Sequence, residues 1–189
     1  MESRQSLRAR LRHTRQLLSS TQQASAAQHL LAHTLEADLL AGCTSLALYC
    51  PQDGEIDPIL LAHTAWQNAI PVYLPVIDPL LTGVMRFHQW LPDTPMQANR
   101  FGIPEPQHTP EIAAQSLHTV MLPLVGFDAH GNRLGMGGGF YDRAFAFTLS
   151  ANTTRLIGLA HECQKVPSLP CEAWDIPLEG VLTDQNYYQ

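Results

Sequence analysis

The stretch Leu134-Gly135-Met136-Gly137-Gly138-Gly139-Phe140-Tyr141-Asp142-Arg143 places four glycines in five positions directly before a segment typical of a helix start. Because glycine has no Cβ, the backbone N–H groups of such a run can converge on one point without steric clash. The first turn of the following helix adds unpaired N–H groups and the positive end of the helix dipole. The stretch therefore predicts a phosphate-binding loop, and the alternative is a glycine hinge that binds no ligand.

Two common phosphate motifs do not fit this loop. The Walker motif continues from its last glycine into Lys and Ser or Thr, whereas Gly139 is followed by Phe140. The dinucleotide motif G-x-G-x-x-G fits Gly135 and Gly137, but its third glycine would fall on Phe140. The loop is therefore of another kind.

The segments around the loop alternate between helical and strand patterns. Helices are expected at residues 3–18, 21–41, 57–68 and 141–149, and strands at 45–49, 72–76, 84–88, 119–125, 155–160 and 180–183. Residues 128–132 form a turn, and residues 91–110, with five prolines, form a long ordered loop. The alternation predicts one α/β domain over residues 1–189, with an open, mainly parallel sheet covered by helices on both faces.

Ligands of such sheets collect at the carboxyl ends of the strands. Residues 50–55 follow the first strand, the glycine loop follows the 119–125 strand, and Asp175 lies beyond the 155–160 strand. We therefore expect these three segments to face one crevice.

The composition is that of a small cytoplasmic enzyme. The chain has 189 residues, 45% of them hydrophobic, which is enough for one core. A net charge of −6 argues against a nucleic-acid partner, and the apolar runs are too short to span a membrane. We expect a monomer.

Four irregularly spaced cysteines indicate reduced thiols, and His29 and His33 lack the further ligands of a zinc site.

The first 35 residues are rich in Arg, Ser, Gln and Ala and nearly free of acids, a composition that also describes an organellar transit peptide. We interpret them as mature structure, because the family resemblance described next includes Arg4 and Arg8.

The segment GNRLGMGGGFYDR at residues 131–143 resembles the nucleotide-binding signature of the 5-formyltetrahydrofolate cyclo-ligase family, also called 5,10-methenyltetrahydrofolate synthetases. Other segments fit the family in order: the basic amphipathic residues 4–15, PQDGEID at 51–57, RFGIPEP at 100–106 and WDIP at 174–177. The resemblance spans nearly the whole chain. It implies ATP-dependent cyclisation of 5-formyltetrahydrofolate to 5,10-methenyltetrahydrofolate, with ATP and Mg²⁺ as cofactors.

The resemblance also implies which residues bind the nucleotide and the metal. The expected ATP-binding residues are Arg4, Arg8, Arg133, Leu134, Gly135, Met136, Gly137, Gly138, Gly139, Phe140 and Tyr141. Asp142 and Asp175 are the expected magnesium ligands, and Arg133 and Asp142 the expected catalytic residues. The alternatives are a solvated basic face for Arg4 and Arg8, a dipole-complementing role for Asp142, and a turn cap for Asp175.

The expected folate-binding residues are Cys50, Glu55, Met136, Gly137, Gly138, Gly139 and Phe140. A carboxylate such as Glu55 can accept two hydrogen bonds from adjacent pterin N–H groups. Cys50 has an inert core thiol as its alternative, and Phe140 has core packing. Met136 and Gly138 depart from the family, because many relatives carry Arg or Lys there, so Arg4, Arg8, Arg133 and magnesium would carry more of the phosphate charge.

Two other classes of function use a similar loop. One is a non-catalytic module that binds a nucleotide or phosphometabolite, which predicts affinity without turnover. The other is a sugar-phosphate isomerase or acyl-transfer enzyme on a similar sheet, which predicts turnover without ATP.

Overall fold

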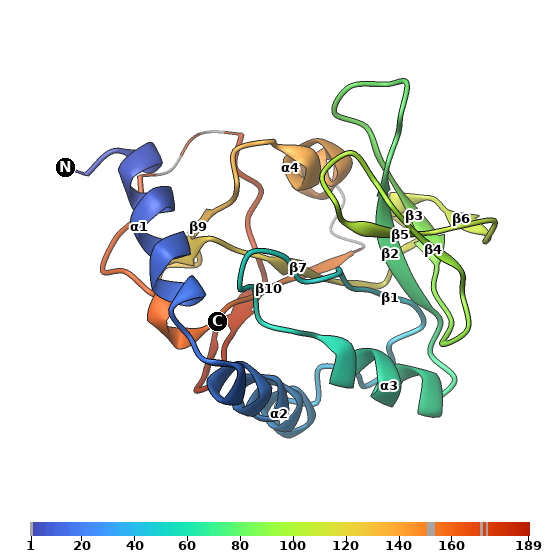
Figure 1. The fold of residues 1–189 in the computed structure, drawn as a ribbon, viewed down its shortest axis with the longest axis horizontal. Helices are drawn as coiled ribbons and strands as arrows, with labels where there is room; N and C mark the ends of the chain where they lie inside the picture. The colour runs from blue at the N-terminus through green and yellow to red at the C-terminus, as the bar shows by residue number, and fades with distance from the viewer. Residues whose placement is uncertain (1, 151–153, 171, 173) are drawn as a thin grey trace.

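The computed structural model describes residues 2–150, 154–170, 172 and 174–189. Within these residues an eight-stranded sheet has the order β12-β11-β10-β7-β1-β2-β3-β6 (Figure 1). Its strands are β1 (Leu46–Ala47), β2 (Val72–Ile77), β3 (Met85–Gln89), β6 (Glu111–Ile112), β7 (Thr119–Pro123), β10 (Arg155–Leu159), β11 (Gly180–Leu182) and β12 (Tyr187–Tyr188). The central strands β11, β10, β7, β1 and β2 pair in parallel, and the edge strands β3, β6 and β12 pair antiparallel. The prediction of a mainly parallel sheet is confirmed.

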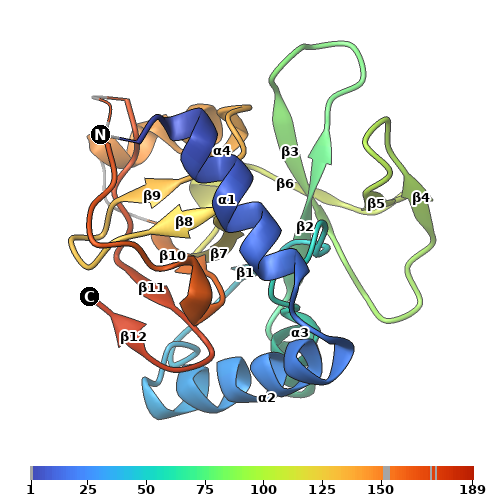
Figure 2. The ribbon, with the colours of Figure 1, turned by 60° about the vertical axis from the view of Figure 1, so that its left-hand side comes forward.

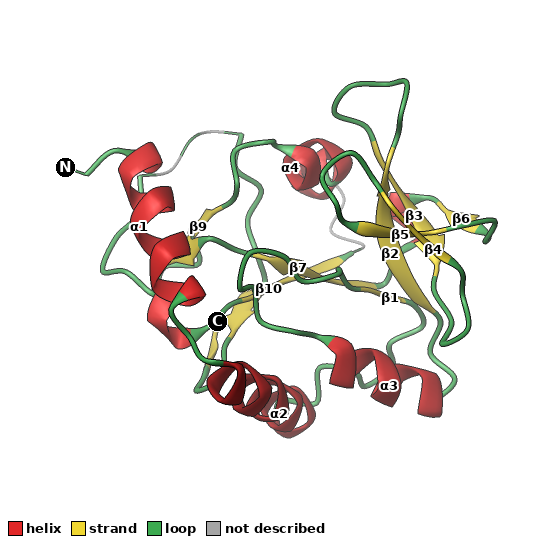
Figure 3. Cartoon of the chain, viewed as in Figure 1, coloured by secondary structure: helices red, strands yellow, loops and turns green. Residues whose placement is uncertain are grey.

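Helices cover both faces of this sheet, as predicted (Figures 1 and 3). On one face α2 (Ser20–Glu36) and α3 (Ile59–Gln67) bury side chains such as Leu30 and Leu61 against Leu46 of β1. On the other face lie α4 (Phe140–Ala144) and the 3₁₀ turn Ala146–Leu149, and Phe145 between them packs against Val120 of β7. The predicted continuous helix over 141–149 is thus divided at Phe145.

The first helix, α1 (Arg4–Gln16), packs beside the sheet on a small hairpin (Figure 2). Ser3 caps its start by accepting a hydrogen bond from the Ser6 N–H at 3.1 Å. Leu7 and Leu11 pack in one cluster with residues that include Leu134 of this hairpin. The buried stripe of α1 continues from these leucines to Arg15, and α1 ends at Gln16 instead of the predicted residue 18.

That hairpin consists of β8 (Gly126–Phe127) and β9 (Arg133–Leu134). Asp128 makes the connecting turn, because its carboxylate accepts hydrogen bonds from the N–H groups of His130 and Asn132. The predicted turn at 128–132 is confirmed, and it leads the chain directly into the glycine loop.

The second helix is shorter than predicted. Ser19 begins α2 with a capping box that includes Gln22. The helix ends at Glu36 instead of 41, because Asp38 adopts a left-handed φ of 52°. The N–H groups of Asp38 and Leu39 bond back to the carbonyls of Leu35 and Thr34, which is the pattern of a Schellman motif.

The proline-rich region 91–110 contains a hairpin that the sequence did not predict, formed by β4 (Met96–Ala98) and β5 (Pro104–Pro106) (Figure 2). Asn99 organises its turn, because Asn99 Oδ1 accepts from the N–H groups of Phe101 and Ile103. Buried Glu105 ties the hairpin to the end of β2 through a 2.8 Å hydrogen bond from the Ile77 N–H.

Cys43, Cys50 and Cys163 are free thiols, as predicted, and Cys171 lies outside the described residues. No described helix is both long enough and apolar enough to cross a bilayer.

Candidate active site

A cavity of about 1280 Å³ lies at the carboxyl ends of β1 and β7. It is lined by residues from all three segments that were expected to face one crevice. Of the predicted site residues, those that line it are Arg4, Arg8, Cys50, Glu55, Arg133, Gly135, Met136, Gly137, Gly138, Gly139, Phe140, Tyr141, Asp142 and Asp175. Leu134 is not among them, because its side chain is buried in the cluster under α1.

The glycine loop forms one wall of this cavity. Gly137 and Gly139 have φ values of +94° and +64°, a conformation that side chains with a Cβ rarely adopt. Within the described part of the chain, the N–H groups of Gly137, Gly138 and Gly139 donate to no protein acceptor. Arg8 lies beside the loop and donates from Nε to the Gly135 carbonyl at 2.8 Å. The loop and Arg8 of α1 together therefore present backbone donors and a guanidinium to the cavity.

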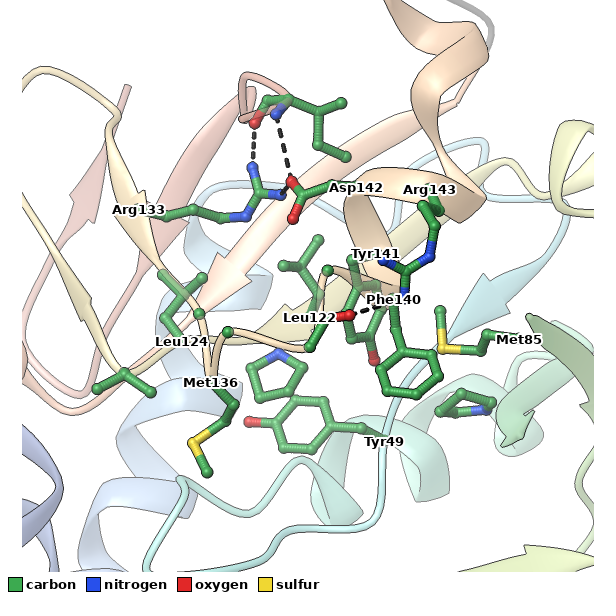
Figure 4. Close-up of a pocket in the computed structure, with 18 of the residues that line it drawn as sticks. Tyr49, Met85, Leu122, Leu124, Arg133, Met136, Phe140, Tyr141, Asp142 and Arg143 are labelled. Carbon is green, nitrogen blue, oxygen red and sulfur yellow. Dashed lines mark hydrogen bonds and ion pairs between the residues drawn. The ribbon is translucent and has the colours of Figure 1, made fainter. Parts of the chain in front are cut away.

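Buried Arg133 and half-buried Asp142 form an ion pair at the back of the loop, and Figure 4 shows the two side chains facing each other. The other guanidinium nitrogen of Arg133 donates to the carbonyl of Ile176. Burial lowers the pKa of Arg133, and the nearby carboxylates of Asp142 and Asp175 oppose that effect. The pair joins the start of α4 to the segment that carries Asp175.

Asp175 is held in turn by Arg4. The Arg4 guanidinium donates to both carboxylate oxygens, at 2.8 and 3.3 Å, and to the Pro170 carbonyl at 3.0 Å. Burial raises the pKa of Asp175, but the hydrogen bonds from Arg4 and from the Glu172 N–H outweigh it, so its pKa lies below the usual value. Each predicted metal ligand is thus paired with an arginine that was predicted to bind phosphate.

The metal-binding capacity of these carboxylates is limited. Among residues 2–150, 154–170, 172 and 174–189, no group of three or more His, Cys, Asp or Glu side chains could hold a metal ion. Asp142 and Asp175 both interact with the charge of Arg133, so they lie in the same corner of the cavity. Two carboxylates with phosphate and water oxygens are a donor set that suits Mg²⁺.

Glu55 lies in the cavity at the end of a tight turn formed by residues 52–55. The Glu55 N–H donates to the Gln52 carbonyl at 2.9 Å, and Asp53 and Gly54 between them have φ values of 55° and 76°. Positive φ at both central positions is typical of a type I′ turn, for which Asp-Gly is a preferred pair. Glu55 Oε2 accepts from the Gln52 N–H at 3.0 Å. Burial is the largest effect and raises the pKa of Glu55 above its usual value. That N–H and the charge of Arg15 oppose the rise.

Cys50 precedes this turn and lies three residues beyond β1. Burial raises the pKa of its thiol to about 11, so the thiol is protonated at neutral pH and is a poor nucleophile. Its place in the cavity agrees with a packing contact.

Two residues that shape the site were not predicted. Arg15 is fully buried and bonds to the Asp53 turn. Arg143 bridges two loops, donating to the carbonyls of Gly83 at 3.0 Å and Gly138 at 2.7 Å, and it stacks over Phe140 (Figure 4). Arg15 could have been noticed in the sequence because it is a charged residue eight positions after Leu7, on the same helical face. For Arg143 the only signal was its place directly after Asp142.

A mainly parallel sheet with a glycine loop and a large cavity at its carboxyl edge defines the class of protein, an α/β protein with room for a ligand at the strand ends. The model of the 5-formyltetrahydrofolate cyclo-ligase family matches residues 1–184, and the chain belongs to this family. It is 40% identical to the 5-formyltetrahydrofolate cyclo-ligase of Haemophilus influenzae over 183 residues, which cover 96% of this chain and 97% of the relative. The Escherichia coli K12 relative of the same name is 34% identical, with coverage of 95% and 99%.

Solved structures give the same result for the fold. The 5,10-methenyltetrahydrofolate synthetase of Aquifex aeolicus superimposes with a TM-score of 0.83 at 25% identity, covering 98% of this chain and 92% of that one. The synthetase of Mycoplasma pneumoniae gives a TM-score of 0.77 at 21% identity, with coverage of 97% and 100%.

Proposed function

We propose that this protein catalyses the ATP-dependent cyclisation of 5-formyltetrahydrofolate to 5,10-methenyltetrahydrofolate, with release of ADP and phosphate. The observation that carries the proposal is the convergence on one cavity of the glycine loop, two arginine–carboxylate pairs and Glu55. Its volume of about 1280 Å³ exceeds the roughly 300–1,000 Å³ of a typical single-ligand site, as two ligands side by side require.

The chemistry explains why ATP is needed. The formyl group of the substrate is an amide on N5, and closure onto N10 must expel its oxygen, which is a poor leaving group. Transfer of the γ-phosphoryl group to the formyl oxygen, attack by N10 on the activated carbon and loss of phosphate yield the methenyl product. Catalysis then depends on positioning the two substrates and stabilising phosphate charge, not on a protein nucleophile.

The phosphate side of the cavity supplies those functions. The free N–H groups of the glycine loop and the guanidinium of Arg8 are suited to cradle the phosphates. Arg4 and Arg133 would exchange a carboxylate oxygen for a phosphate oxygen when ATP enters. Asp142 and Asp175 would then be free to hold Mg²⁺, which neutralises phosphate charge when bound. These arginines and the metal compensate for the uncharged Met136 and Gly138.

The folate side lies toward the residue 52–55 turn. Glu55 is suited to accept hydrogen bonds from the pterin ring, with Cys50 next to it in packing contact. Phe140 and Tyr141 line the same cavity and offer aromatic surfaces for stacking (Figure 4). We further propose a monomeric cytoplasmic enzyme that binds no nucleic acid, in keeping with the net charge of −6.

One assay tests the proposed function. The conjugated amidinium of the product absorbs at longer wavelength than the substrate, so the folded protein with 5-formyltetrahydrofolate, ATP and Mg²⁺ should give a rising absorbance. Reactions without ATP and with EDTA in place of Mg²⁺ should give none. A flat trace with all components would reject the proposal. Binding of ATP without turnover would favour a non-catalytic module, and turnover of a sugar phosphate without ATP would favour an isomerase.

Glu55→Gln should weaken binding of 5-formyltetrahydrofolate by about tenfold to a hundredfold, because a charge-assisted hydrogen bond contributes roughly 1.5–3 kcal/mol. ATP binding should change little, since Glu55 lies on the other side of the cavity. Arg8→Ala should show the reverse selectivity. Calorimetric titration of each variant with each ligand separately measures both effects, and equal losses for both ligands would indicate damage to the fold instead.

A further inference from the structure

Arg15 contacts Asp53 and Leu124, which line the cavity, but does not itself line it. Its side chain is fully buried, although an arginine on the first helix of a small protein is ordinarily solvated. It occupies the third position of the buried stripe of α1, after Leu7 and Leu11. A buried charge is costly unless it is fully hydrogen-bonded, so the contacts of this guanidinium indicate its role.

The guanidinium of Arg15 joins two parts of the site. Nε donates to the Asp53 carbonyl at 2.8 Å, and Nη2 donates to Asp53 Oδ2 at 3.0 Å. Nη1 donates to the Leu124 carbonyl at 2.9 Å, just beyond the end of β7. Arg15 therefore fastens the residue 52–55 turn to the strand that leads to the glycine loop.

The same guanidinium reaches Glu55. Arg15 Nη2 lies 3.5 Å from Glu55 Oε1, whose partner oxygen is bonded to the Gln52 N–H. The backbone turns tightly against the helix here, because a Cβ on Gly54 would lie 3.1 Å from the Arg15 carbonyl oxygen. The position of Glu55 thus follows from a turn that is clamped on one side by Arg15.

We propose that Arg15 is a positioning residue that holds the Glu55 carboxylate in place for the pterin ring. The inference rests on the proposed function for its choice of ligand. Arg15 acts through Glu55 and does not touch the substrate. A planar fork with several donors is required, because the Asp53 carbonyl, the Asp53 carboxylate, the Leu124 carbonyl and Glu55 must be bound at once.

The charges around Glu55 support this role. The charges of Arg12 and Arg15 of α1 and of Asp53 in the turn act on Glu55, and the charge of Glu55 acts in turn on Tyr49 and Tyr141. Burial raises the pKa values of both tyrosines, so they are neutral near pH 7. His161 bonds to the Gly54 carbonyl, and burial lowers its pKa. Arg15 is the cation in direct contact with Glu55, so its removal would raise the pKa of Glu55 further.

The first test is a double-mutant cycle on ligand binding. Arg15→Lys keeps a charge but loses the fork, and it should lower 5-formyltetrahydrofolate affinity about tenfold while ATP affinity stays within about twofold. The double variant with Glu55→Gln should bind folate no more weakly than Glu55→Gln alone, because both changes act on one contact. Three results would overturn the proposal: additive losses of folate affinity in the double variant, unchanged folate affinity in Arg15→Lys, or an equal loss of folate and ATP affinity in Arg15→Lys.

Arg12→Lys is the matched control. Arg12 lies on the same helix and also binds the Asp53 carboxylate, at 2.6 Å, but its side chain is 41% exposed and makes no ion pair with Glu55. Its folate affinity should stay within about twofold of the unsubstituted protein. A tenfold loss in this variant would mean that any disturbance of Asp53 has the same effect, and would overturn a specific role for Arg15.

A second test needs no ligand. The titration of the Glu55 carboxyl can be followed by NMR with ¹³C-labelled glutamate, and its signal is identified by its loss in Glu55→Gln. In Arg15→Gln the midpoint should move to higher pH, and Arg15→Lys should restore part of that shift. An unmoved midpoint in a folded variant overturns this proposal alone. Absence of folate binding by the unsubstituted protein would instead reject the proposed function. If Arg15→Gln does not fold, the Arg15→Lys titration carries the test.

Discussion

Asp142→Asn is expected to lower turnover about a hundredfold and to leave the protein folded, which is the scale seen when one charge-stabilising group is removed from a transition state. The substitution keeps the shape of the side chain and one oxygen that can accept from Arg133. It removes the negative charge that faces that guanidinium and that we propose for Mg²⁺. Loss of the ion pair should cost about 1–3 kcal/mol of stability, which a domain of this size tolerates.

Turnover measured over a range of magnesium concentrations separates the two roles of Asp142. If its carboxylate holds the metal, high magnesium should recover part of the lost rate. Normal turnover at limiting magnesium would mean that Asp142 serves only to orient Arg133 and complement the start of α4. Asp93→Asn, in an exposed loop outside the cavity, is the control and should leave the rate unchanged.

Leu11→Ala should destabilise the protein by about 2–5 kcal/mol, the range for truncating a fully buried leucine. Leu11 is 1% exposed and packs in the cluster that joins α1 to the β8–β9 hairpin. Leu11 packs tightly against the backbone of the hairpin, because a Cβ on Gly126 would lie 2.5 Å from the Leu11 side chain. The cavity left by the truncation lies beneath the helix that carries Arg4 and Arg8.

Urea unfolding monitored by circular dichroism measures this loss as a lower midpoint at an unchanged m-value. Leu17→Ala is the matched control, since Leu17 follows α1 and is 70% exposed; it should change stability by less than about 0.5 kcal/mol. Similar losses in the two variants would contradict the assignment of the Leu11 cluster as a core.

The sheet and the cavity were predictable because they depend on local patterns. Continuous apolar runs such as 119–125 identify central parallel strands, and parallel strands bring their carboxyl ends to one edge. The glycine loop was visible as a short motif with a conformational reason. Glu55 was recognised only through the family resemblance.

The elements that were not predicted depend on exceptions to those patterns. Asp38 ends α2 in a left-handed conformation, and the residue that takes this conformation after a helix is usually glycine. Pro104 and Pro106 lack the N–H of ordinary strand residues, yet they lie in β5 because that strand belongs to a two-stranded hairpin. In both cases the residue type at the position predicts another local structure than the one the chain adopts.

The pairing of the site charges was beyond any local pattern. Arg4 and Arg133 were predicted to face phosphate, and the structure pairs them with Asp175 and Asp142. Arg15 sits on an apolar stripe, where helical spacing predicts a hydrophobic residue. Partners for such charges come from distant segments, so they become apparent only when the chain is folded.

The position of α1 has a consequence for synthesis of the protein. Arg4, Arg8 and Arg15 bond to partners that lie 171, 127 and 109 residues later in the chain. The apolar side of α1 packs partly on Val166 and Leu169, so it has no complete binding surface until most of the chain has left the ribosome. Contacts between such distant segments form slowly. Until they form, the apolar side of α1 stays exposed, which makes the chain prone to aggregation. We therefore expect the nascent helix to be a target for chaperones, and docking of its arginines to be among the last steps of folding.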